Sequence, residues 1–244
     1  MHDPTKKVAL VTGANKGIGR EIARQFGKAG MIVLLGARDT VLGEAAAAKL
    51  REEKLDVHFL LLDLVRPETI AAAAASIAAQ FQQLDILINN AAILDQADGP
   101  PSSADLNSVK RVMETNFLGT LAVTQAMLPL LRKSKAARIV NLSSGLASLE
   151  KNGDPGWDFA AFKLIGYNAS KAALNMLTVQ LAFELRGAGI KVNSISPGFV
   201  ATDMNAHRGT LTVEEGAAGP VRLALLPPDG PSGGFFDQHG SHPW

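Results

Sequence analysis

The chain has 244 residues, of which 47% are hydrophobic, and its 24 Lys and Arg nearly balance its 23 Asp and Glu. This length suits one large α/β domain, and the balanced charge gives no reason to expect nucleic acid or an anionic membrane as a partner. Cysteine is absent, which excludes disulfides, thiol nucleophiles and cysteine-bound zinc or iron–sulfur clusters.

The same composition predicts neither a membrane segment nor a metal site. No apolar run reaches the length of a membrane span, and Met1–Lys7 lacks the apolar stretch of a signal peptide, so we expect a cytoplasmic protein. Of the five histidines only His239 and His242 lie close together. Two histidines without carboxylates at fixed geometry rarely bind a metal.

Short apolar runs alternate with longer amphipathic ones, as strand–helix units of a parallel sheet require. In chain order we predict strand Lys7–Thr12, helix Gly17–Ala29, strand Met31–Ala37, helix Val41–Lys54, strand Val57–Leu62, helix Pro67–Phe81, strand Asp85–Ile88, a turn-rich segment Asp95–Ser103 leading to helical sequence up to Arg132, strand Arg138–Leu142, irregular Gly145–Gly166, helix Tyr167–Arg186, strand Lys191–Ser196, a loop and helix to about Leu226, and a short strand around Phe235–Phe236. No linker or repeat interrupts the pattern. It predicts an α/β fold, a single doubly wound Rossmann-type domain over residues 1–244 with about seven parallel strands and helices on both faces.

A glycine-rich turn, Thr12–Gly19, joins the first predicted strand to the first predicted helix. Glycines let the backbone approach a pyrophosphate, and the helix N-terminus supplies oriented N–H groups and a positive dipole. Three residues separate the first two glycines, unlike the commonest dinucleotide fingerprint. Its place after the first strand favours a dinucleotide site.

The end of the second strand indicates which dinucleotide is bound. NAD-specific folds place an acidic residue there to hold the ribose 2′-hydroxyl, whereas this chain has Gly36-Ala37-Arg38. Arg38 can pair with a 2′-phosphate, and Lys16 in the glycine turn can add a second charge. Both side chains can equally be ordinary solvated cations, and Asp39 follows directly. We favour NADP(H) over NAD(H).

The only tyrosine, Tyr167, precedes Lys171 by four residues in a predicted helix. This spacing places both side chains on one face. An ammonium near a phenol favours the phenolate and lowers the phenol pKa, as a general acid–base for a carbonyl oxygen needs. Taken alone, the spacing is a common accident.

Together these motifs resemble the short-chain dehydrogenase/reductase family over almost the whole chain. The turn Thr12–Gly19 matches the family's T-G-x-x-x-G-x-G, and Asn89-Asn90-Ala91 matches its N-N-A motif. Asn116, Ser144, Tyr167 and Lys171 match its catalytic tetrad in order, and Pro197-Gly198, Val200 and Thr202 match the segment beside the nicotinamide. Asn15-Lys16-Gly17, Gly36-Ala37-Arg38 and the late Tyr167 resemble the carbonyl-reductase branch.

The resemblance implies a role for each matching residue. Tyr167 would give its proton to the carbonyl oxygen as hydride arrives, Lys171 would hold the ribose and keep the phenol acidic, Ser144 would bind the substrate oxygen, and Asn116 would hold a proton-relaying water. Ser143 remains an alternative to Ser144. Asp63 and Leu64 would contact the adenine, and Asn90 the adjoining ribose. The other residues implied in cofactor binding are Gly13, Asn15, Lys16, Gly17, Ile18, Gly19, Arg38, Ala91, Tyr167, Lys171, Pro197, Gly198, Val200 and Thr202.

Two segments bear on specificity. Between Ser144 and Tyr167 lies an insertion that carries Trp157, Phe159 and Phe162, which either wall the substrate pocket or pack the loop's own small core. Ala201–Thr212, called the lid below, is expected to be a flexible cover over the substrate. His207 in the lid fits a solvent-facing position better than a ligand contact.

The resulting hypothesis is an NADP(H)-dependent oxidoreductase that interconverts a small-molecule carbonyl and alcohol. The alternative is a non-catalytic NADP(H) sensor on the same scaffold, although such proteins tend to lose the Tyr or the Lys. A hydrolase is disfavoured because no G-x-S-x-G elbow is present. Both a monomer and a homo-oligomer remain open, because the insertion before Tyr167 is shorter than the one that appears to obstruct pairing in monomeric relatives.

Overall fold

Seven strands form one parallel sheet in the order β3-β2-β1-β4-β5-β6-β7 in the computed structural model, which describes residues 5–244. Residues 1–4 of the segment Met1–Lys7 lie outside the described residues. The strands are β1 Val8–Val11, β2 Ile32–Ala37, β3 Val57–Leu61, β4 Ile86–Asn89, β5 Arg138–Leu142, β6 Lys191–Ile195 and β7 Phe235–Phe236. This order, in which β1 lies between β2 and β4, confirms the predicted doubly wound Rossmann-type fold.

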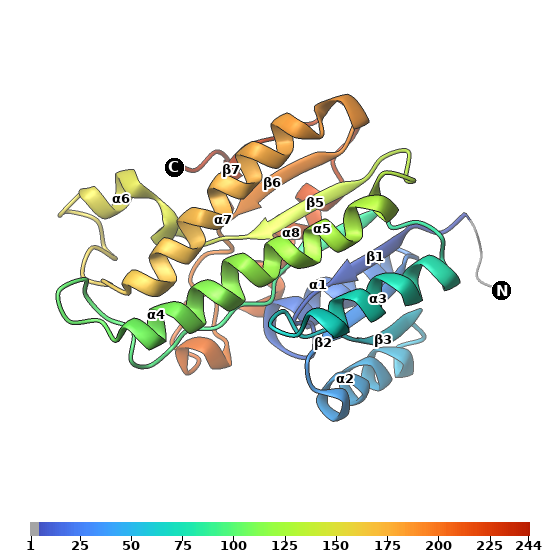
Figure 1. The fold of residues 1–244 in the computed structure, drawn as a ribbon, viewed down its shortest axis with the longest axis horizontal. Coiled ribbons are helices and arrows are strands. Elements are labelled where there is room, and N and C mark those ends of the chain that lie inside the picture. The colour runs from blue at the N-terminus through green and yellow to red at the C-terminus, as the bar shows by residue number, and fades with distance from the viewer. Residues whose placement is uncertain (1–4) are drawn as a thin grey trace.

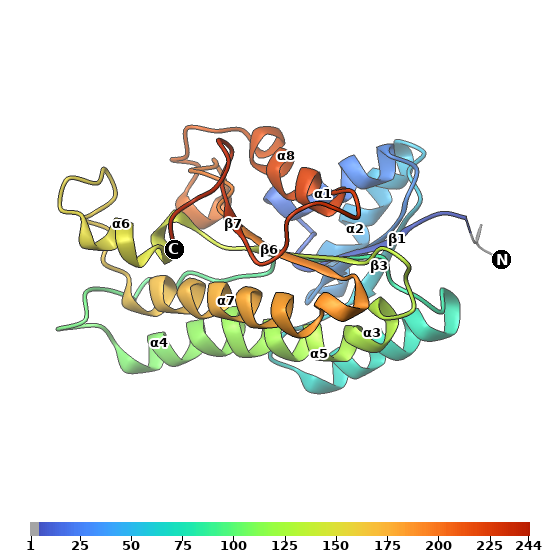
Figure 2. The same cartoon turned by 90° about the horizontal axis from the view of Figure 1, so that it is seen from above.

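Helices cover both faces of this sheet (Figures 1 and 2). On one face lie α3 (Pro67–Gln80), α4 (Leu106–Met113), α5 (Thr120–Leu131) and α7 (Ile165–Glu184); on the other lie α1 (Gly17–Lys28), α2 (Thr40–Glu52) and α8 (Val213–Ala224). Short helical segments complete the chain: η1 (Glu114–Gly119), η2 (Gly145–Ala147), α6 (Leu149–Gly153), η3 (Arg186–Ala188) and η4 (Asp203–Asn205). Within residues 5–244, no helix is long and apolar enough to cross a bilayer.

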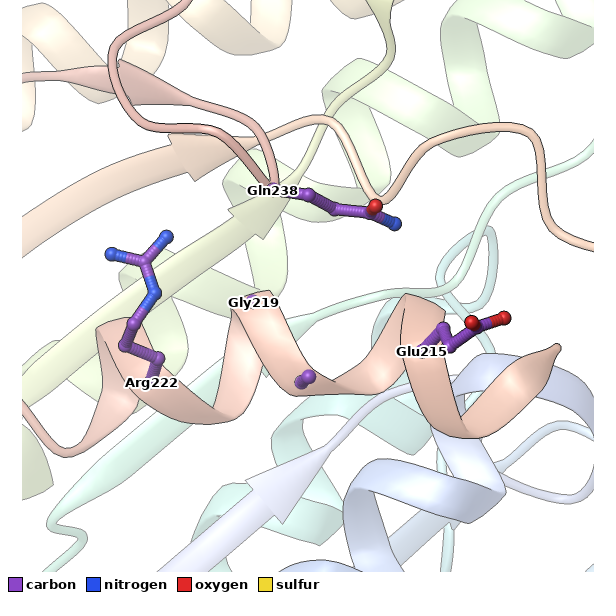
Figure 3. Close-up of a pocket in the computed structure, with 5 residues that line it drawn as sticks. Glu215, Gly219, Arg222 and Gln238 are labelled. Carbon is purple, nitrogen blue, oxygen red and sulfur yellow. The ribbon is translucent and has the colours of Figure 1, made fainter. Parts of the chain in front are cut away.

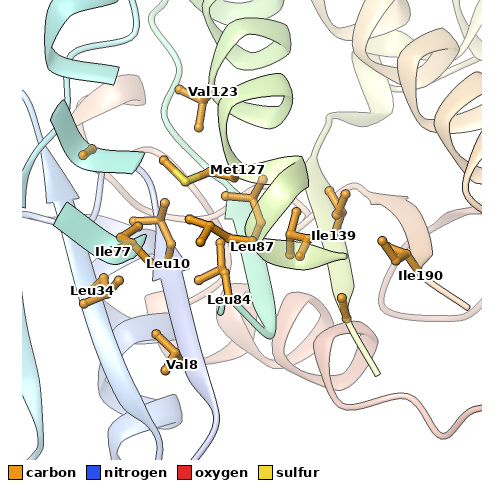
Figure 4. Packing of buried hydrophobic residues seen from close by; sticks show 14 of the residues in the cluster. Val8, Leu10, Leu34, Ile77, Leu84, Leu87, Val123, Met127, Ile139 and Ile190 are labelled. Carbon is orange, nitrogen blue, oxygen red and sulfur yellow. The ribbon is translucent and has the colours of Figure 1, made fainter. Parts of the chain in front are cut away.

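Each face of the sheet has its own hydrophobic core, because successive side chains of a strand point to opposite faces. On β1, Val8 and Leu10 join the core under α3, α5 and α7, part of which Figure 4 shows, while Ala9 and Val11 join the core under α1, α2 and α8. Strands buried on both faces explain the continuous apolar runs in the sequence. We propose a single domain, since one sheet carries both cores.

The predicted elements agree with the structure to within one or two residues, with two differences. The stretch 145–166, predicted to be irregular, contains η2 and α6, and the Ser148 side chain starts α6 by accepting a hydrogen bond from Lys151 N. The helical sequence before Arg132 is not uniformly α-helical, because η1 is a π-helical segment. Such segments are rare and frequently occur at functional sites.

The N-terminus of α7 is fixed by a residue far away in the sequence. No side chain of the local sequence caps this helix. Instead, the Asp98 carboxylate accepts hydrogen bonds from Gly166 N at 2.9 Å and Tyr167 N at 2.8 Å. Asp98 therefore supplies the acceptors that a local cap normally provides, and it positions the first turn that carries Tyr167.

Candidate active site

Tyr167 and Ser144 lie together at the carboxyl ends of the central strands. Tyr167 is in the first turn of α7, and Ser144 follows β5 with an extended backbone at φ −158° and ψ 150°. The Ser144 side chain lies near the Tyr167 phenol and acts to lower its pKa. The neighbouring Ser143 is buried and directed at the Lys171 carbonyl oxygen at 3.5 Å. The structure thus brings Ser144, rather than Ser143, to the phenol.

Lys171 lies one turn after Tyr167 and is almost fully buried, with 3% of its surface exposed. Its Nζ donates a hydrogen bond to Leu142 O at 2.7 Å and lies 5.9 Å from the centroid of the Tyr167 ring. Burial lowers the pKa of Lys171 to about 8, because a charged ammonium loses solvation there. The side chain is therefore an ammonium at neutral pH that loses its proton easily.

Lys171 does not lower the pKa of the Tyr167 phenol as expected. Loss of solvation raises the pKa of Tyr167 above its ordinary value, and the hydrogen bond from Ser144 offsets part of this effect. The reason is geometric: the Lys171 ammonium is directed at Leu142 O rather than at the phenolic oxygen. The prediction from the four-residue spacing is correct on proximity but wrong on the direction of the pKa change.

Asn116 connects two parts of the site from the π-helical segment η1. Its side chain is completely buried; Oδ1 accepts from Ile93 N at 2.8 Å, and Nδ2 donates to Ile93 O at 2.9 Å and to Ser170 Oγ at 3.1 Å. Ser170 Oγ in turn donates to Tyr167 O at 2.8 Å. Asn116 therefore ties the loop after β4 to the helix that carries the tyrosine, and both Nδ2 hydrogens are used in doing so.

The glycine turn packs directly against the N-N-A motif. Asn90 Nδ2 donates to Thr12 O at 2.8 Å and to Gly13 O at 3.2 Å. A Cβ on Gly19 would lie 2.4 Å from this nitrogen, and one on Gly13 would lie 2.8 Å from Ala91 Cα. Only glycine fits these positions. The Asn90 amide nitrogen thus holds the turn in place, and the contact of Asn90 to the cofactor ribose that the resemblance implies stays a prediction.

The predicted cofactor contacts at the end of β2 and β3 occupy different environments. Arg38 is exposed, and its side chain makes no hydrogen bond or ion pair within residues 5–244. Asp63 Oδ1 accepts from Val65 N at 3.2 Å, while Leu64 is buried against Gly119, where a Cβ would meet Leu64 O at 2.6 Å. Among the residues that the structure describes, Arg38 therefore has no ionic partner at this end of the site.

Lys16 does not lie free beside Arg38. Its Nζ forms an ion pair with Asp203 Oδ2 at 2.7 Å, across to the lid. Lid residue His207 is paired with the same carboxylate through Nε2–Oδ1 at 2.9 Å, so it is not merely solvated. The Pro197–Thr202 segment connects β6 to the lid. Val200 in this segment is buried, and Thr202 Cγ2 lies 3.6 Å from where a Cβ on Gly17 would be.

Aromatic rings connect the insertion before Tyr167 to the segment after β6. Phe159 lies 5.6 Å from Trp157, 5.7 Å from Phe162 and 5.8 Å from Phe199, measured between ring centroids. Trp157 Cζ2 also lies 3.7 Å from the position of a Cβ on Gly145, next to Ser144. The rings therefore pack beyond their own loop, onto both segments that flank the Ser144–Tyr167 pair.

Comparisons with known proteins agree with this geometry. Residues 7–211 match the sequence profile described as short chain dehydrogenase. The chain belongs to the short-chain dehydrogenase family. It is 35% identical to short-chain dehydrogenase/reductase 1 of Saponaria officinalis, covering 98% of this chain and 96% of the relative, and 35% identical to the (+)-neomenthol dehydrogenase of Arabidopsis thaliana, covering 98% of each. The structure of an NADPH-bound carbonyl reductase from chicken fatty liver superposes with a TM-score of 0.83 at 31% identity, covering 98% of this chain and 99% of that one.

The turn of this short-chain dehydrogenase fits a dinucleotide on physical grounds. Gly13 and Gly17 have φ values of +64° and +56°, in the left-handed region that favours glycine. Because glycine has no side chain, the backbone of the turn is uncovered at both positions. The N-cap Lys16 makes no side-chain cap hydrogen bond, and the first turn of α1 holds no acidic residue. The first N–H groups of α1 therefore remain available for a phosphate, with Asn15 and Ile18 on either side.

Sequence reasoning missed three residues of the dehydrogenase site. Asp98 caps α7 from 68 residues away, Asp203 pairs with Lys16, and Phe199 extends the aromatic cluster. Phe199 lies within the Pro197–Thr202 segment and Asp203 directly follows it, so the sequence identified their neighbourhood but not the residues that they contact. Asp98 has no local signal, because its partners come from another part of the chain.

A surface hollow of about 290 Å³ lies elsewhere on the enzyme, along α8 (Figure 3). Glu215, Gly219, Arg222 and Gln238 line it together with Ala218. None of these residues belongs to the Ser144–Tyr167–Lys171 group. Within residues 5–244, no group of three His, Asp or Glu side chains is arranged to hold a metal ion.

Proposed function

We propose that this short-chain dehydrogenase interconverts a carbonyl and an alcohol with NADP(H), and that Tyr167 exchanges the proton. The observation that carries the proposal is that Ser144, Tyr167 and the buried Lys171 ammonium lie together, with Lys171 Nζ 5.9 Å from the centroid of the Tyr167 ring. When bound, the nicotinamide supplies hydride to the carbonyl carbon or accepts it from the alcohol. The chain itself must then provide one proton at the oxygen.

In the reduction, the substrate oxygen accepts hydrogen bonds from Ser144 and Tyr167, and the Tyr167 hydroxyl gives its proton to that oxygen. The ammonium of Lys171 has three donors, of which one is used on Leu142 O. The other two are suited to the ribose hydroxyls of the cofactor. Asn116 holds the helix turn in place through Ser170 and is a positioning residue.

The preference for NADP(H) is assigned to Arg38. Its guanidinium is exposed at the end of β2, and the turn adjoins that strand through the hydrogen bond from Ala14 N to Gly36 O at 2.9 Å. A planar guanidinium binds a phosphate through paired hydrogen bonds. The related carbonyl reductase named above was solved with NADPH bound.

The substrate class follows from the aromatic cluster of Trp157, Phe159, Phe162 and Phe199. Trp157 lies near Gly145, the neighbour of Ser144, and Phe162 at the other side of the cluster is 46% exposed. Rings of this kind favour an apolar, ring-bearing carbonyl compound, which stacks on them and buries its surface. The name of a relative, (+)-neomenthol dehydrogenase, agrees with a cyclic alcohol. The cytoplasmic location expected from the sequence is part of this proposal.

Cyclic and open-chain ketones, assayed with NADPH and NADH at the absorbance of the reduced nicotinamide, test the proposal. We expect turnover of cyclic ketones with NADPH, and loss of it in Tyr167→Phe with NADPH binding retained. Phe159→Ala should raise KM for cyclic ketones more than for small open-chain ones. If NADPH binds but no carbonyl is reduced, the protein is a dinucleotide sensor rather than an enzyme.

A second comparison tests the 2′-phosphate assignment. Arg38→Ala should weaken NADPH binding much more than NADH binding. Arg132→Ala removes an exposed arginine at the end of α5, far from this site in the sequence, and serves as the matched control. Equal losses for the two cofactors in Arg38→Ala would contradict the assignment.

A further inference from the structure

The glycine turn and the lid lie side by side and are joined by an ion pair. The Lys16–Asp203 ion pair, at 2.7 Å, links residues 187 positions apart. Beside it, the Thr202 methyl group lies over Gly17, 3.6 Å from where a Cβ would be. Lys16 immediately precedes α1, so the ion pair lies beside the first N–H groups of that helix, which are suited to bind a phosphate.

Asp203 has two partners in this arrangement. Lys16 Nζ is bound to Oδ2 and His207 Nε2 to Oδ1, so both carboxylate oxygens have cationic or hydrogen-bonding partners. Hydrogen bonding to Lys16 is the largest cause of the lowered pKa of Asp203. Lys16 is therefore already paired within the chain.

Lys16 belongs to the turn that lies beside the end of β2. The hydrogen bond from Ala14 N to Gly36 O places the turn beside the end of β2, two residues before the exposed Arg38. The long lysine side chain is 63% exposed and free to reorient. An ammonium on this turn can pair either with the Asp203 carboxylate, as it does here, or with a cofactor 2′-phosphate near Arg38.

We propose that Asp203 is a specificity-determining residue that competes with the 2′-phosphate for Lys16. NADPH draws Lys16 away from the lid, whereas NADH, which has no 2′-phosphate, leaves the Lys16–Asp203 pair intact. The pair therefore weakens NADPH binding selectively, and its release frees the lid only when the phosphorylated cofactor is bound. This inference rests on the NADP(H) assignment of the proposed function.

Dissociation constants measured by fluorescence titration with NADPH and NADH test the competition without requiring turnover. Since exposed ion pairs are weak, Asp203→Asn should tighten NADPH binding by about two- to five-fold and leave NADH binding unchanged. Glu214→Gln, which removes an exposed acid at the start of α8 outside the lid, is the matched control and should change neither constant.

A double variant isolates the role of the lysine. In a Lys16→Gln background, Asp203→Asn should no longer affect NADPH binding, because the shared ammonium is gone. The inference is overturned if Asp203→Asn weakens NADPH binding, tightens both cofactors equally, or acts without Lys16. Wild-type protein that binds neither cofactor would refute the proposed function as well, whereas a failure confined to the Asp203 variants would refute this inference alone.

Discussion

Replacement of Lys171 by methionine should stabilise the cofactor-free protein at neutral pH while abolishing its activity. The ammonium is 3% exposed, and burial lowers its pKa from 10.5 to about 8. That lowering corresponds to about 3 kcal/mol by which the folded state disfavours the charge. Methionine removes this cost but leaves Leu142 O without its donor, which costs about 1 kcal/mol. The net gain is about 2 kcal/mol at pH 7, or roughly 4–8 °C in Tm.

The gain from Lys171→Met should depend on pH in a defined direction. Below pH 8 both the folded and the unfolded chain carry the charge, so wild type bears the whole cost. Between about pH 8 and 10.5 the folded side chain loses its proton before the unfolded one does, and the cost declines. Urea unfolding should therefore show the gain at pH 7 and little of it at about pH 9.5.

A control variant separates burial from charge removal in general. Lys110→Met removes an exposed ammonium on α4 and should change the free energy of unfolding by at most about 0.5 kcal/mol at either pH. The reasoning is refuted if Lys171→Met leaves the protein no more stable than wild type at pH 7, or if its gain is the same at both pH values.

Two further substitutions test the framework of the site. Asp98→Ala removes the remote cap of α7. It should lower the free energy of unfolding by about 1–2 kcal/mol in urea and lower kcat more than it weakens NADPH binding. An unchanged kcat would show that Asp98 does not position Tyr167. Gly19→Ala places a methyl group 2.4 Å from Asn90 Nδ2 and 2.8 Å from Gly13 O. It should destabilise the protein by about 1–3 kcal/mol and weaken NADPH binding more than ten-fold. Normal NADPH affinity in a titration would contradict the close packing of the turn.

Most of the fold was predictable because it depends on local patterns. Apolar runs buried on both faces, such as Ile32–Ala37, can only be strands of a covered parallel sheet, and Gly30 and Pro67 mark helix boundaries through their own backbone preferences. The π-helical segment around Asn116 was not predictable, since helix-forming residues carry no signal that distinguishes π from α geometry.

The site was predictable in its members but not in its electrostatics. Motif order placed Ser144, Tyr167 and Lys171 together, yet the direction of the Tyr167 pKa depends on burial and on the partner that Lys171 finds, neither of which the spacing contains. The Lys16–Asp203 pair was hidden for the same reason: residues 187 positions apart meet only through tertiary folding.

The central claim is proton exchange by Tyr167 coupled to hydride transfer from NADPH. A single-turnover reaction of a cyclic ketone with NADPH carrying deuterium at both C4 positions measures it directly, with mass spectrometry of the alcohol product. The account predicts deuterium at the carbinol carbon with wild-type protein, and a rate about 10²- to 10⁴-fold lower in Tyr167→Phe at unchanged NADPH affinity. A wild-type rate in Tyr167→Phe, or an alcohol product without the label, would contradict it.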